Sequence, residues 1–125
     1  MLVQFIRLIY LLAAGLSMAA AALVTASMVI AERAPQTTWF WGVTIFISLF
    51  FAGLALLLLG IAWHLPAIGQ IAHCNTHEAL APAFRRHWEW LAVIMAIAGL
   101  LLCLFLLLGV YVIIARIDQG FAVFG

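Results

Sequence analysis

The hydrophobic positions of this chain fall into three long runs, over residues 8–30, 39–63 and 91–115. None of the runs contains an Asp, Glu, Lys, Arg or His residue. As a helix with a rise of ~1.5 Å per residue, each run is long enough to cross the ~30 Å hydrocarbon core of a bilayer. The pattern predicts an all-α integral membrane protein in which residues 1–125 form a single membrane domain, folded as an antiparallel three-helix bundle.

Two polar connections separate the runs. The first, over residues 31–38, is so short that it makes the first two spans antiparallel neighbours. The second, over residues 64–90, holds all four histidines of the chain. Pro66 predicts a kink, after which the second span continues as a helix towards His73. Asn75 and the residues after it resemble a helix start. We therefore expect a short polar helical hairpin between the second and third spans.

Small side chains recur at helical spacing in all three runs. Such residues let helix backbones approach closely in lipid. The first run is small on every face, which suits the middle of a bundle. By default these residues pack within the chain, but their excess in the first run predicts that it also docks another subunit through Gly15, Ser17, Ala19 and Ala21. The second run has a small stripe at Thr44, Ser48, Ala52 and Ala55, and the third at Ala92, Ala96, Gly99 and Cys103. The bulky side of the second run, with Phe50, Phe51, Leu54 and residues 56–59, is expected to face lipid or another subunit.

Composition supports the membrane assignment. Apolar residues make up 70% of the chain and charged residues 7%, against roughly 25% charged residues in soluble domains. The mean hydropathy is +1.32. The net charge of +1 provides no electrostatic field for nucleic acid. Trp39 and Trp41 at one end of the second run, and Trp63 at the other, indicate aromatic belts at the two membrane interfaces.

The arginines predict an orientation. Arg7, Arg85 and Arg86 fall on the N-terminal side of the predicted bundle, and Arg33 and Arg116 on the other. The positive-inside rule then favours a cytoplasmic N-terminus and an external C-terminus in a bacterial inner membrane. The small residues at positions 24–26 resemble a signal-peptide cleavage site, but the apolar run continues to Ile30, so we expect this segment to remain as a span.

One cluster in the polar connection has metal-ligand chemistry. His73 and His77 are four residues apart, so on a helix they could share a metal ion with Cys74. No second pair of ligands occurs at a recognisable spacing. We therefore favour polar residues on a solvated hairpin, with metal binding as the alternative.

A second set of residues flanks the membrane surface. His64 and His87 could be axial ligands of a haem, or one of them could bind a chlorophyll-type pigment. Neither histidine lies deep in a span, so we favour interfacial side chains and expect no cofactor. Arg85, Arg86 and Trp88 have the chemistry of a site for anionic phospholipid.

The absence of certain functional groups and motifs from the sequence narrows the range of possible functions. Ion-coupled transporters keep ionisable residues at membrane depth, and this chain has none there. No nucleophile–base pair, P-loop or dinucleotide motif occurs. We therefore expect a non-catalytic accessory subunit of a larger membrane complex, by analogy a respiratory or photosynthetic electron-transport assembly, with other subunits and phospholipids as partners. The alternatives are a small homo-oligomeric transporter or channel and a haem- or pigment-binding membrane anchor.

Overall fold

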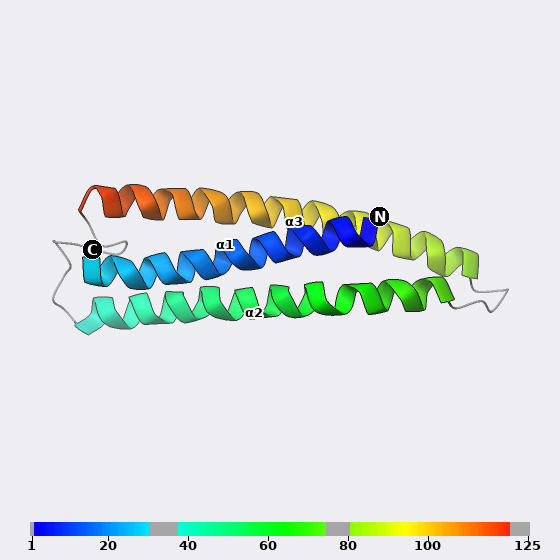
Figure 1. Cartoon of the computed structure of the whole chain (residues 1–125), viewed down its shortest axis with the longest axis horizontal. Coiled ribbons are helices and arrows are strands. Elements are labelled where there is room, and N and C mark those ends of the chain that lie inside the picture. Colours follow the sequence, from blue (N-terminus) through cyan, green and yellow to red (C-terminus); the bar gives the residue numbers. More distant parts are fainter. Residues whose placement is uncertain (1, 31–37, 75–80, 121–125) are drawn as a thin grey trace.

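The computed structural model describes residues 2–30, 38–74 and 81–120; the side chains of residues 38, 71–74 and 81–85 lie outside the described part. The described chain consists of three α-helices, α1 (Leu2–Ile30), α2 (Thr38–Cys74) and α3 (Ala81–Asp118), shown in Figure 1. Each helix contains a segment long and apolar enough to cross a membrane. For the described residues, the prediction of an all-helical chain with three helices long and apolar enough to span a membrane is thereby confirmed.

The helices are longer than the apolar runs that predicted them. α1 begins at Leu2, and α2 and α3 contain 37 and 38 residues, which is about 55 Å each at ~1.5 Å per residue. α2 passes through Pro66 and ends at Cys74, so the predicted continuation towards His73 is confirmed. A proline costs the helix one hydrogen bond and does not have to end it. The predicted boundaries at residues 63 and 91 mark the ends of the apolar runs and not of the helices; the expected helix start at Asn75 lies outside the described residues.

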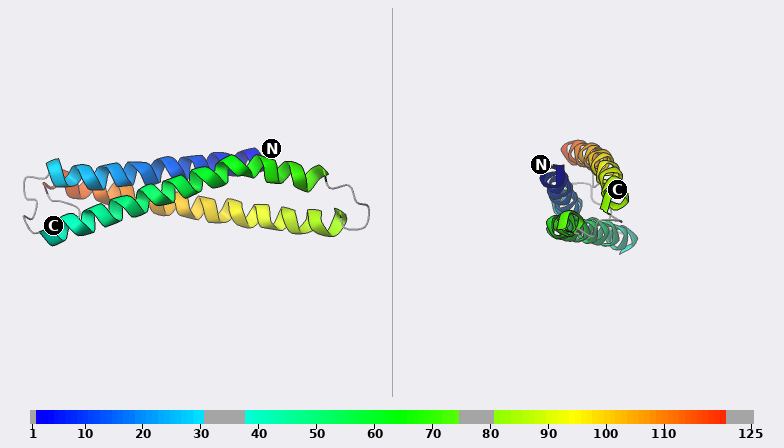
Figure 2. Two further views of the ribbon diagram at one scale, coloured as in Figure 1. Left: turned by 90° about the horizontal axis from the view of Figure 1, so that it is seen from below. Right: turned by 90° about the vertical axis from the view of Figure 1, so that its right-hand side faces the viewer.

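α1 lies between the other two helices (Figure 1). It packs along both of them, whereas α2 and α3 scarcely touch each other. Within the most apolar segment of each helix, the buried share is 44% in α1 but only 17% in α2 and in α3. α2 is inclined to the other two helices (Figure 2). α1, which is rich in small side chains, is therefore the central helix. α2 and α3, which carry larger side chains, keep most of their surface exposed.

α3 packs on α1 through its small stripe. A Cβ atom added to Gly99 would lie 2.8 Å from Ile9 Cγ2, which shows how closely the two backbones approach. Cys103 Sγ donates a hydrogen bond to the Ile9 carbonyl at 3.4 Å, and the Tyr10 hydroxyl donates one to the Met95 carbonyl at 3.4 Å. The small side chains on α3 thus serve packing within the chain.

α2 packs on α1 through hydroxyl side chains. Ser17 Oγ donates a hydrogen bond to the Phe51 carbonyl at 2.7 Å, and Thr25 Oγ1 lies 2.9 Å from Ser48 Oγ. Ser17 is fully buried. Lipid offers no partner to a polar group, so such groups must be satisfied inside the protein. All buried side-chain polar atoms of the described residues have a hydrogen-bond partner.

The prediction that the bulky side of α2 faces lipid or another subunit was wrong for Leu58. Leu58 is only 3% exposed and belongs to the main hydrophobic core. It stands three residues after Ala55 and four before Ala62, both buried, and residues at these spacings share one face of a helix. Phe51 is also partly buried against the core, whereas Phe50 and the adjacent leucines at positions 56, 57 and 59 are exposed as predicted.

The hydrogen bond from Ser17 to α2 predicts a measurable loss of stability. Replacing Ser17 by Ala removes a bond between helices, and we expect a cost of about 0.6 to 1.7 kcal/mol in the free energy of unfolding. Thr44→Val is the control, because the Thr44 hydroxyl bonds only to the Phe40 carbonyl of its own helix. Unfolding in mixed micelles measures both variants. Equal losses in the two would contradict a special role for the Ser17 bond.

The contact at Gly99 predicts a second effect. Gly99→Leu places a side chain where only a hydrogen atom fits against Ile9 and Tyr10, and overpacking of this kind costs about 1 to 3 kcal/mol. The same substitution at Gly109 is the control, because nothing lies within 4 Å of its added Cβ. We expect Gly99→Leu to lower the unfolding midpoint and Gly109→Leu to leave it nearly unchanged; the reverse order would show that α1 and α3 do not pack in this register.

Candidate functional site

The best candidate for a ligand site is an apolar cleft between α2 and α3. It has a volume of about 460 Å³, within the usual range for small-ligand sites. We call it the His64 cleft. Its lining residues are Gly60, Ile61, His64, Leu65 and Ile68 on α2 and Trp88, Leu91 and Met95 on α3. The spacings of three and four residues place each set on one face of its helix.

The His64 cleft exposes only apolar atoms. His64 and Trp88 are the two lining residues whose side chains carry nitrogen. Water needs polar partners and does not fill such a space. The wall is suited to a hydrocarbon group.

Of the two histidines proposed as cofactor ligands, His64 lines the cleft and His87 does not. His64 is exposed and lines the cleft, whereas His87 is exposed and lies outside the lining set. The cleft itself was not foreseen from the sequence, because it arises from the separation of α2 and α3. The sequence contained one indication of the cleft, because Gly60, His64 and Ile68 are four residues apart and share one face of a helix. Binding of a haem or a chlorophyll-type pigment stays a hypothesis.

The proposed metal ligands fall largely outside the described part of the chain. His73 and Cys74 are in the last turn of α2, but their side chains are not described, and His77 lies in the undescribed connection. Among the residues that the structure does describe, no group of three or more His, Cys, Asp or Glu side chains could hold a metal ion. The metal site therefore stays a prediction.

The proposed lipid-binding residues occupy different sides of α3. Trp88 lines the His64 cleft, and Arg86 is exposed two positions earlier. At about 100° per residue, this spacing puts the two side chains on nearly opposite sides of the helix. The side chain of Arg85 is not described. Lipid binding by the three residues stays a prediction, and only Trp88 borders the cleft.

The residues proposed for docking another subunit separate into two groups. Ser17 and Ala21 are buried inside this chain, whereas Gly15 and Ala19 are exposed. Gly15 lies in a groove of about 370 Å³ formed with Leu8, Leu11, Leu12 and Leu16. We define the outer seam of α1 as Leu8, Leu12, Gly15, Ala19 and Ala22, all of them exposed. Its spacing of four and three residues is that of a helix-packing face.

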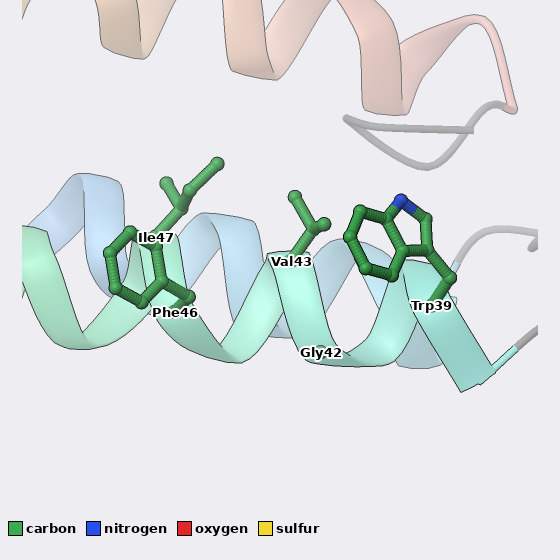
Figure 3. A pocket seen from close by; sticks show the side chains of 5 residues that line it. All are labelled: Trp39, Gly42, Val43, Phe46 and Ile47. Atoms are coloured by element: carbon green, nitrogen blue, oxygen red, sulfur yellow. The ribbon is translucent and has the colours of Figure 1, made fainter.

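A third cavity lies near the start of α2, with a volume of about 630 Å³. Its lining residues are Trp39, Gly42, Val43, Phe46 and Ile47. Figure 3 shows Trp39, Val43 and Ile47 extending from α2 towards the side on which α3 lies. All five belong to one helix, and they are again apolar. This hollow lies towards the opposite end of α2 from the His64 cleft.

No protein-family model matches this chain, and no curated protein or solved structure is significantly similar to it.

The apolar wall of the cleft predicts the absorption of the purified protein. Because the surface of the cleft is apolar, we expect freshly isolated protein to show no visible absorption band. A band that is present in the wild type and is lost in His64→Ala would contradict this expectation and establish a tetrapyrrole ligand. His87→Ala provides the matched control for loss of a neighbouring exposed histidine.

Proposed function

We propose that this chain is a non-catalytic accessory subunit of a larger multi-subunit membrane complex and that it docks through the outer seam of α1. In this proposal it is an antiparallel three-helix bundle with a polar hairpin at residues 64–90. It resides in a bacterial inner membrane with its N-terminus in the cytoplasm and its C-terminus outside. An energy-converting electron-transport assembly is the proposed setting, by analogy with other small apolar subunits.

The observation that carries the proposal is the exposure of small residues in register on the central helix. Packing within the chain accounts for Ser17 and Ala21, which are buried, and leaves Gly15, Ala19 and Ala22 exposed. An added Cβ on Gly15 meets nothing within 4 Å. The outer seam therefore has no packing role inside this chain that would require its small residues.

The physical chemistry of lipid makes this seam suitable for another helix. Between apolar helices in a bilayer there is little hydrophobic drive, and association depends on close packing and lipid entropy. A seam of Gly and Ala lets a second backbone approach closely. The neighbouring Leu8 and Leu12 supply bulky side chains beside the notch at Gly15, so a partner helix would find both a groove and its walls.

The absence of ionisable groups from the three predicted runs supports a non-catalytic role. The described hydroxyl groups at membrane depth are used for packing: Ser17 and Thr25 bond to α2 or to their own helix, and Thr44 bonds to Phe40. Such groups hold helices together and provide no acid, base or nucleophile for chemistry. Partner subunits would then supply any catalytic activity of the complex.

The first test is to isolate the native chain in a mild detergent and to identify by mass spectrometry the proteins that accompany it. We expect partner chains in a fixed ratio. Gly15→Leu fills the notch in the outer seam and should reduce their recovery about tenfold, a loss near 1.4 kcal/mol. Gly109→Leu is the control, since it makes the same change at an exposed glycine of α3 with open space around it.

Two results would overturn the proposal. Isolation of the chain with copies of itself alone would favour the homo-oligomeric transporter or channel. Full recovery of partners with Gly15→Leu would show that the outer seam is not the docking face, and Ala19→Leu checks the same seam one turn further along.

A further inference from the structure

Two contacts fix how α1 lies along α2. Near the start of α1, a Cβ atom added to Gly69 would lie 3.2 Å from Val3 Cγ2. Further along, Thr25 Oγ1 lies 2.9 Å from Ser48 Oγ. A step towards the N-terminus of α1 therefore corresponds to a step towards the C-terminus of α2, and the start of α1 lies beside the final part of α2 (Figure 1).

Arg7 lies at one edge of this contact. It precedes Thr25 by 18 residues, which is five turns at ~3.6 residues per turn, so the two residues share one side of α1. On α2, Pro66 follows Ser48 by the same 18 residues and shares its side of the helix. Thr25 is exposed although it contacts Ser48, so this side is the open edge of the contact. Arg7 and Pro66 therefore stand at the same edge, near the start of α1.

Three further side chains with N–H groups share this edge. Gln4 precedes Arg7 by three residues. Trp63 precedes Pro66 by three residues and Gln70 follows it by four, and residues at these spacings share a helical face. At ~1.5 Å per residue, Gln4 and Gln70 lie within about 2 Å of the level of the first contact between α1 and α2, whereas Arg7 is about 6 Å and Trp63 about 9 Å further in. All four side chains are exposed, and we call Gln4, Arg7, Trp63 and Gln70 the Arg7 patch.

The Arg7 patch combines hydrogen-bond donors with one positive charge. A guanidinium group has five N–H donors, each glutamine amide has two, and an indole has one. In the part of the chain that the structure describes, the acidic residues are Glu89 and Asp118, both on α3. α3 packs on Ile9, which is two residues after Arg7 and so on nearly the opposite side of α1. The patch is therefore suited to an anion that accepts several hydrogen bonds.

We propose that the Arg7 patch binds the phosphate group of an anionic phospholipid. A charged side chain near the end of a membrane helix extends to the headgroup level. Because Cα–Cβ bonds tilt towards the N-terminus of a helix, the Arg7 side chain leaves α1 in the direction of the nearer membrane surface. Trp63 is of the type that marks the headgroup level. Arginine holds phosphate through two parallel N–H···O bonds, which are among the stronger hydrogen bonds in proteins.

The surface below the patch favours a phospholipid over a free phosphate ion. Leu11 follows Arg7 by four residues and Leu59 precedes Trp63 by four, so each leucine shares the helical face of its polar neighbour. Both leucines are exposed, and both lie deeper along the bundle than the patch. A donor-rich surface is thus followed by apolar surface on the same two faces, which is the order of headgroup and hydrocarbon in a phospholipid.

Phosphate binding at this edge goes beyond the docking of α1 and does not depend on it. Arg7 directly precedes Leu8, the first residue of the outer seam, and is therefore about 100° away from Leu8 around the helix. Arg86 and Trp88 belong to α3, so the Arg7 patch is also separate from the lipid-binding residues expected there. An acidic side chain of a partner subunit is the competing occupant.

The test compares two exposed arginines. Arg7→Gln removes the charge of the patch, and Arg116→Gln makes the same change near the end of α3. The purified chains are stripped of lipid, incubated with dioleoyl phosphatidylglycerol and analysed by native mass spectrometry. We expect the wild type and Arg116→Gln to retain the phospholipid and Arg7→Gln to retain about tenfold less. Equal retention by Arg7→Gln and the wild type, or equal losses in both variants, would overturn the proposal.

Further measurements keep the result interpretable. Circular dichroism and elution volume verify that each variant is folded. Should Arg7→Gln fail this check, Trp63→Phe takes its place, because it removes one N–H donor and keeps an aromatic ring; we expect about threefold less phospholipid, and an unchanged amount would contradict the proposal. Dioleoylglycerol has the same acyl chains without the phosphate and should not be retained. Its retention, or displacement of the phospholipid by excess inorganic phosphate, would equally count against a phospholipid site.

A photoreactive side chain identifies the occupant in the native membrane. Benzoylphenylalanine in place of Gln4 should cross-link to phospholipid, and cross-links to a partner protein alone would show that an acidic group of that protein occupies the patch instead. The same photoreactive residue in place of Leu8 reports on the outer seam, so a failure of α1 docking and a failure of phosphate binding are observed separately.

Discussion

The close approach of backbones along α1 is the constraint on which the rest of the structure depends. Water drives apolar helices together, but lipid does not, and helices in a bilayer must gain their stability from dense contact and from satisfied polar groups. α1 provides both, because its small residues admit α3 at Gly99 and its Ser17 hydroxyl reaches the backbone of α2. Since α2 and α3 scarcely contact each other, α1 determines where both of them lie.

This arrangement leaves space wherever α1 does not fill the angle between its neighbours. The hollow near Trp39 and the His64 cleft both border α2, one towards each end of the helices. Of the two, the His64 cleft is lined by both α2 and α3, and a bundle in which these two helices packed closely would have closed it. This cleft is thus a consequence of a central helix that contacts both of its neighbours while they scarcely contact each other.

The sequence was sufficient to predict the helices, because three uncharged apolar runs admit few other structures in a bilayer. It also indicated that the small residues of the first run would by default pack within the chain, and Ser17 and Ala21 are buried. It could not indicate which small residues would stay exposed. Gly15 and Ser17 are both small residues. Only the positions of α2 and α3 around α1 leave Gly15 exposed and bury Ser17.

The candidate site was less predictable than the fold. His64 was recognisable as the one histidine at the end of an apolar run, but its partners across the cleft come from α3, and no local pattern connects Gly60 with Met95. Leu58 illustrates the same limit, since it is buried on the face that it shares with Ala55 and Ala62, whereas the leucines beside it in the chain are exposed.

The length of α2 has a consequence for its ends. A continuous helix of about 55 Å cannot be contained in a hydrocarbon layer of ~30 Å, even with the modest tilt that membrane helices adopt. In a bilayer, part of α2 must therefore extend beyond the hydrocarbon layer. Because the helix is continuous through Pro66 to Cys74, that part belongs to the same element as the residues that cross the layer.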